Sequence, residues 1–135
     1  MNFQDMLTEK RLRDLDEMVA EISAEELKAK LEAGEIFQLI DVSEPEAFQK
    51  GHLPTAENLP LTELGQVAPA RFRPFQQLVV YCAEADSSLA QVAARLLQDL
   101  GFYNVLVLKG GKEAWRQAGY ELVSDAEPTG AGSDD

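Results

Sequence analysis

The chain contains one cysteine, Cys82, and its position decides which chemistry the sequence can support. Residues 78–92 read LVVYCAEADSSLAQV, so an apolar run ends at the thiol and a short polar stretch leads into a helical pattern. A helix N-terminus favours anions, so it would lower the pKa of a nearby thiol and make it reactive as a thiolate. The alternative is that a lone cysteine is only a small buried apolar residue. Position alone leaves both interpretations open.

Three apolar runs predict the strands that would position this cysteine. Residues 36–42 (IFQLIDV), 78–82 (LVVYC) and 104–108 (NVLVL) read as strands buried on both faces, as parallel strands are. Cys82 would then lie at the carboxyl end of a central strand. Open α/β sheets bind their ligands at that edge.

Helical patterns alternate with these strands. Ser23 and Glu26 form a capping box that begins a helix, and Gly34 suits its end. One apolar stripe predicts a helix before Gly101, made of Leu89, Val92, Ala93, Leu96, Leu97 and Leu100. A short helix is expected after Gly110, with Trp115 facing inward. Residues 53–76 hold four of the six prolines and predict mostly loop with short pieces of structure. The alternation predicts an α/β fold with a mainly parallel sheet.

Length and composition predict one soluble domain with extensions. The chain of 135 residues can bury a real core. Residues 4–20 show helical spacing, so we expect a helical extension over 1–21, a domain over 22–123 and a disordered acidic tail over 124–135. No apolar window is long enough for a membrane span, and the charged N-terminus does not resemble a signal peptide. A cytoplasmic location is expected.

The charge and the residue counts exclude several classes of function. The net charge of −12 argues against nucleic acids and anionic membranes as partners. One cysteine cannot form an internal disulfide, and one histidine cannot form a histidine metal cluster. We therefore expect no metal site. The oligomeric state is not predicted.

The sequence resembles a single-domain rhodanese, a member of the sulfurtransferase family, over residues 22–122. Three motifs carry the resemblance by their order and spacing: IDVSEPEAFQKGHLPTAENLP, VVYC and GFYNVLVLKGGKEAW. The resemblance implies a three-layer rhodanese-like fold with helices on both faces of the sheet. It also implies Cys82 as the nucleophile, which takes sulfur from a donor such as thiosulfate and holds it as a persulfide.

The same resemblance implies how the sulfur is bound and released. The binding loop would be Ala83, Glu84, Ala85, Asp86, Ser87 and Ser88, whose N–H groups would hold the persulfide. The sulfur would pass to cyanide, a thiol or a protein acceptor, with no metal or organic cofactor, in a two-step covalent mechanism. With no second cysteine in the chain, release requires an outside acceptor.

The sequence also departs from the family pattern. Ser87 stands where the family carries a loop arginine, and Ser43 stands where it usually carries a second one. Weak activity with thiosulfate is therefore expected. The alternative is a rhodanese-like binding or regulatory module that has lost its activity. A cysteine-dependent phosphatase or arsenate reductase is disfavoured, because that chemistry needs an arginine fork to hold a dianion.

Other residues near these motifs have mainly structural interpretations. Asp41 is a possible support for the active-site loop, but it is expected mainly to bond nearby backbone N–H groups. His52 is expected to be a turn residue and not a base. Ser87 and Ser88 could bond a persulfide or simply cap the helix. A last possibility is that Arg71 or Arg73 lies over the mouth of the site and replaces the missing arginine.

Overall fold

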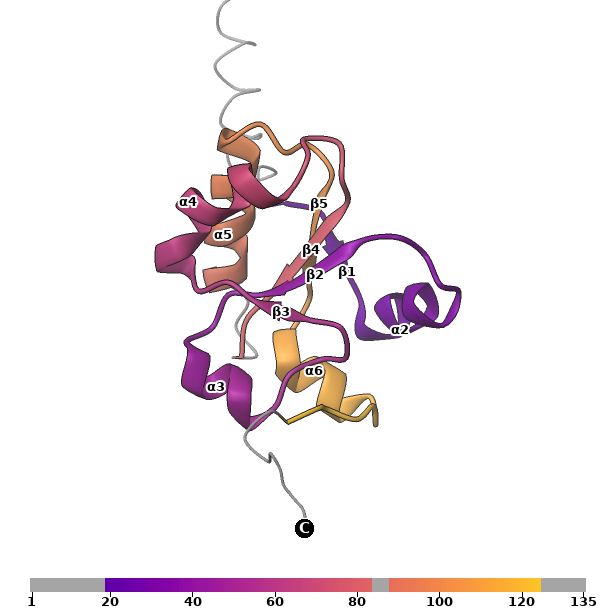
Figure 1. The fold of residues 1–135 in the computed structure, drawn as a ribbon. Helices are drawn as coiled ribbons and strands as arrows, with labels where there is room; N and C mark the ends of the chain where they lie inside the picture. Colours follow the sequence, from indigo (N-terminus) through magenta and orange to yellow (C-terminus); the bar gives the residue numbers. More distant parts are fainter. Residues whose placement is uncertain (1–18, 84–87, 125–135) are drawn as a thin grey trace, which may run out of the picture.

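A computed structural model describes residues 19–83 and 88–124 (Figure 1). Its centre is a five-stranded sheet in the order β1-β5-β4-β2-β3, and every pairing is parallel. The strands are β1 (Glu21–Ile22), β2 (Gln38–Asp41), β3 (Glu57–Asn58), β4 (Leu78–Tyr81) and β5 (Val105–Leu108). The three predicted strands are confirmed as the inner ones. The two edge strands were not predicted, since two residues are too few to form a pattern.

Helices cover both faces of the sheet, which confirms the three-layer architecture (Figure 1). They are α2 (Ala24–Glu32), α3 (Pro45–Lys50), α4 (Leu61–Arg71), α5 (Ser88–Asp99) and α6 (Gly111–Gln117). Helices α4 and α5 cover one face, and α2 and α6 cover the other. The predicted helical extension before residue 19, most of the binding loop and nearly all of the C-terminal tail fall outside the described residues.

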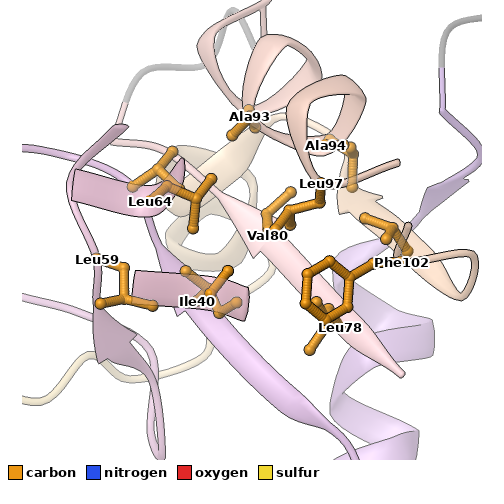
Figure 2. Packing of buried hydrophobic residues seen from close by; sticks show 14 of the residues in the cluster. Ile40, Leu59, Leu64, Leu78, Val80, Ala93, Ala94, Leu97 and Phe102 are labelled. Atoms are coloured by element: carbon orange, nitrogen blue, oxygen red, sulfur yellow. The ribbon is translucent and has the colours of Figure 1, made fainter. Parts of the chain in front are cut away.

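Strand β4 supplies side chains to both halves of the core. Leu78 and Val80 point toward α4 and α5, where they meet Ile40, Ala93 and Leu97 (Figure 2). Val79 and Tyr81 point to the other face, among the apolar side chains of α2 and α6. Because side chains alternate along a strand, Cys82 falls on the same face as Leu78 and Val80.

The apolar stripe of α5 was only partly predicted correctly. Val92 is 54% exposed and Leu100 is 40% exposed, although both belong to the predicted stripe. The face that packs on the sheet is instead centred on Ala90, Ala93, Ala94 and Leu97. Small alanine side chains let the helix backbone approach the sheet closely, so the buried face follows the alanines and not the largest residues.

The prediction of mostly loop over residues 53–76 is wrong, because this stretch contains α4. Pro60 precedes the first helical residue, where the lack of an N–H group costs nothing. Leu64 and Ala68 are four residues apart and both are fully buried against the sheet. Pro69 lies near the C-terminal end of the helix. Burial of one helix face outweighs the propensity penalty of the prolines.

The start of the described chain is fastened to α5. The side-chain amide of Gln91 accepts from the Val19 N–H at 2.8 Å and donates to the Val19 carbonyl at 3.2 Å. Beyond it, Ser23 and Glu26 form the predicted capping box of α2. Within residues 19–83 and 88–124, no helix has the length and apolar character needed to cross a membrane.

Candidate active site

Cys82 directly follows β4 at the carboxyl edge of the sheet, as predicted. Its side chain is fully buried on the α4 and α5 face, among the apolar residues of that core. Its carbonyl oxygen accepts a hydrogen bond of 3.0 Å from the backbone N–H of Lys112, the second residue of α6. The thiol therefore lies between the strand end and the helices that cover this face.

The predicted binding loop is only partly described. Ala83 is half-buried, and Ser88 is an exposed first residue of α5. Glu84, Ala85, Asp86 and Ser87 lie outside the described residues, so their role as a persulfide-binding loop stays a prediction. The position of Ser88 shows that α5 starts six residues after the thiol.

The end of β2 lies beside the end of β4. The Val42 N–H donates to the Tyr81 carbonyl at 3.0 Å, which joins the two strand ends. Asp41 Oδ1 accepts from the Ser43 N–H at 2.8 Å, and both residues are buried. The Asn58 side-chain amide donates to the backbone carbonyls of Asp41 and Ser43. The structural role predicted for Asp41 is confirmed, because its carboxylate fixes the turn that leaves β2.

Tyr81 connects this edge to the Gly-His-Leu-Pro turn. Its hydroxyl oxygen accepts from the Leu53 N–H at 3.0 Å. Burial and the nearby Asp41 carboxylate raise the pKa of Tyr81 far above its ordinary value, so the phenol stays protonated. Tyr81 therefore holds the turn and the end of β4 together on the face opposite to the thiol.

His52 is a buried part of the same turn. Its Nδ1 donates to the Leu53 carbonyl at 2.9 Å, since a carbonyl oxygen can only accept. Its ring stacks on Phe48 with the centroids 3.9 Å apart, and its backbone pairs with Val123. These contacts agree with the predicted turn role.

Lys112 is a residue of this edge that the sequence analysis missed. Its ammonium donates to the Gly51 carbonyl at 2.7 Å and to the Ala47 carbonyl at 3.1 Å. The turn before α6 begins at Gly110, which has φ 78°, a conformation that favours glycine. One signal was available in the sequence: a lysine in the first turn of a helix opposes the helix dipole.

The two candidate arginines have other partners in the structure. Arg71 is the last residue of α4 and forms an ion pair with Glu57 on the edge strand β3. Arg73 belongs to a turn with Gln76 that leads into the amino end of β4. Cys82 follows the carboxyl end of β4. Arg73 therefore lies at the other end of the strand from the thiol. The prediction that Arg73 lies over the thiol is therefore wrong, whereas Arg71 is paired with Glu57 and its role at the site stays a prediction.

Comparison with known proteins decides the family. The family profile described as Rhodanese-like domain matches residues 23–118. The chain belongs to the rhodanese-like domain family. The match covers strands β2 to β5 and all the described helices.

Relatives of the domain occur both alone and within longer proteins. A protein of Allochromatium vinosum called a sulfurtransferase is 33% identical over 79% of this chain and 97% of its own length. An HTH-type transcriptional regulator of Mycobacterium tuberculosis is 37% identical over 82% of this chain, but the chain spans only 47% of that regulator. The solution structure of a rhodanese-like domain from Anabaena, 32% identical, superposes with a TM-score of 0.73 over 87% of this chain and 89% of that one.

Proposed function

We propose that this rhodanese-like domain is a sulfurtransferase that carries sulfane sulfur as a persulfide on Cys82. The observation that carries the proposal is the place of the thiol, directly after β4 at the carboxyl edge of a parallel sheet. The relationship to a protein called a sulfurtransferase supports the same chemistry. Thiosulfate is the donor we propose to test first.

The proposed reaction is a balanced pair of displacements. The Cys82 thiolate attacks the outer sulfur of thiosulfate, a new S–S bond forms, and the old S–S bond breaks to release sulfite with its electron pair. A thiolate, cyanide or a protein thiol then attacks the terminal sulfur and regenerates the Cys82 thiolate. The sequence as proposed uses no metal and no organic cofactor, and it predicts ping-pong kinetics.

The electrostatics of the described residues support slow turnover with thiosulfate. Ser43, at the position of one expected arginine, is buried and carries no charge. Arg71 is paired with Glu57 and Arg73 lies at the other edge of the sheet. A dianionic donor therefore lacks these arginine partners, and a protein persulfide is an equally suitable donor for this site. We propose a cytoplasmic location, as the sequence predicts.

The second candidate function is a binding or regulatory module without activity. Two observations favour it: the thiol is fully buried, and a related domain forms part of a transcriptional regulator. A buried cysteine in apolar surroundings has a raised pKa and reacts slowly. The two candidates differ in one measurable property, which is whether Cys82 accepts sulfur.

Mass spectrometry of the intact protein separates the two candidates. After incubation with thiosulfate and removal of the excess, the sulfurtransferase gains the mass of one sulfur atom, and cyanide removes it. The Cys82→Ser variant, which keeps nearly the same size, gains nothing and shows no thiocyanate production. If the wild-type protein stays unmodified after incubation with thiosulfate and also with a small-molecule persulfide donor, the proposal is contradicted. The binding module without activity is then the remaining candidate.

A further inference from the structure

We propose that Lys112 is a positioning residue that fixes Cys82 relative to residues 43–51, the segment that leaves β2 at the same edge of the sheet. The inference rests on the proposed function, because it concerns the geometry of the sulfur-transfer site. Lys112 lies outside the loop of residues 82–88 and away in sequence from Asp41, the two places where the sequence predicted the site.

Three hydrogen bonds from this one residue carry the inference. Its backbone N–H donates to the carbonyl of Cys82 at 3.0 Å. Its ammonium donates to the carbonyls of Gly51 at 2.7 Å and Ala47 at 3.1 Å. The main chain of Lys112 is thus bonded to the cysteine, while its side chain is bonded to the C-terminal end of α3. Movement of α3 relative to the thiol requires that one of these bonds break.

The charge of Lys112 fits this role and is not explained by its own helix. A cation in the first turn of α6 is unfavourable for that helix, whereas a cation at the C-terminal end of α3 is favourable. Within residues 19–83 and 88–124, no carboxylate lies at ion-pair distance from this ammonium. Its partners are carbonyl groups of α3 and the residue after it, so the contact between segments accounts for the lysine.

The surroundings make the position of residues 43–51 matter for the thiol. The Ser43 N–H is held by Asp41, which fixes the start of the segment to the end of β2. Lys112 fixes the other end of the segment, at Gly51. With both ends held, the segment has a fixed position relative to the backbone of Cys82, to which Lys112 is bonded. Sulfur transfer needs such fixed geometry, because a misplacement of about 1 Å can cost on the order of a hundredfold in rate.

Three variants test the inference. Lys112→Met removes the ammonium and keeps most of the stem, and Lys112→Arg keeps a charged donor. Lys109→Met is the matched control. Lys109 is exposed at the same end of the strands, and within residues 19–83 and 88–124 only its backbone N–H is bonded, to the Ile22 carbonyl. For each, we would measure kcat and KM for thiosulfate with cyanide, and the hydrogen exchange of the amides of residues 44–52.

We expect Lys112→Met to lower kcat by on the order of tenfold, as expected when hydrogen bonds from a charged donor are lost, with a smaller change in KM. Exchange over residues 44–52 becomes faster in the same variant. Lys112→Arg recovers most of kcat, and Lys109→Met behaves like the wild type. If Lys112→Met does not fold, Lys112→Gln takes its place, since the amide can keep one of the two hydrogen bonds to carbonyl groups. The kcat of Lys112→Gln must then fall between the kcat of Lys112→Arg and the background measured with Cys82→Ser.

The outcomes separate this inference from the proposed function. An active wild type with an unchanged kcat in Lys112→Met would overturn the inference alone, and faster exchange without a loss of kcat would reduce Lys112 to a cap of α3. A loss that Lys112→Arg does not recover, or one that Lys109→Met reproduces, would also overturn it. A wild type that accepts no sulfur would overturn the proposed function, and the inference with it.

Discussion

The backbone N–H of Leu53 donates to the hydroxyl oxygen of Tyr81 across 3.0 Å, and this bond joins the turn after α3 to the residue just before Cys82. Tyr81 is fully buried, and the Asp41 carboxylate lies near its hydroxyl. The strand that ends at the thiol is thus held on its opposite face by a polar contact within an apolar core.

Tyr81→Phe should destabilise the fold. The change leaves the ring in place but removes the hydroxyl that accepts from the buried Leu53 N–H. An unsatisfied buried donor costs about 1–3 kcal/mol. Urea unfolding followed by circular dichroism measures the difference, and an equal free energy of unfolding in both proteins would show that water replaces the hydroxyl.

Tyr81 should also make the free energy of unfolding depend on pH in the alkaline range. The pKa of Tyr81 is raised in the folded state, by burial first and by Asp41 second, above its ordinary value of 10.0. Above that pH the unfolded chain loses a proton that the folded protein keeps, so the stability from this residue is complete below pH 10 and falls as the pH rises. The difference in unfolding free energy between wild type and Tyr81→Phe should therefore shrink between about pH 10 and pH 11. A constant difference across this interval would contradict the raised pKa.

Asp41 gives a test of the turn that leaves β2. Asp41→Ala leaves the buried Ser43 N–H without its acceptor and should cost about 1–3 kcal/mol of stability. Asp41→Asn can place its amide oxygen at the same position, so it should cost less. Thermal unfolding of the two variants gives the order, and a more stable alanine variant would mean that burial of the charge outweighs the hydrogen bond.

The acids of the binding loop give a prediction about substrate. Glu84 and Asp86 are separated from Cys82 by one and three residues. Like charge near an anionic donor costs about 1 kcal/mol at a partly exposed site. The double variant Glu84→Gln with Asp86→Asn should lower the apparent KM for thiosulfate, by roughly fivefold. It should also flatten the rise of activity that screening by salt gives the wild type. Steady-state kinetics at low and high salt measure both effects, with Glu63→Gln, an exposed acid of α4, as the control. Unchanged kinetics would mean that both acids point away from the donor.

The sequence predicted the inner sheet and the place of Cys82 because both depend on local patterns. Runs such as LVVYC are apolar on both faces, as is typical of a buried parallel strand. The prediction from sequence failed for α4, because the prolines were given more weight than the helical spacing of Leu64 and Ala68. It also failed for Val92, because a pattern of large residues does not show how closely a helix approaches a sheet.

Contacts between distant segments set the limit for the site. Lys112 lies 30 positions after Cys82 and 61 after Gly51, and no periodicity connects them. The ion pair of Arg71 with Glu57 could not be predicted either, because nothing in the sequence shows which acid lies close to Arg71 in the fold. The residue types near the thiol were predictable, but their partners depend on the packing of helices on the sheet.

The two hydrogen bonds between Gln91 and Val19 have a consequence for association between molecules. An open sheet edge offers unpaired N–H and C=O groups on which another chain can add a strand. On the β1 side, the amide of Gln91 takes both polar groups of Val19, and β1 itself is only two residues long. On the β3 side the strand is also two residues long, and Asn58 turns its side chain back to β2. Neither edge offers a long template, so the described fold resists strand-by-strand aggregation at both ends of its sheet.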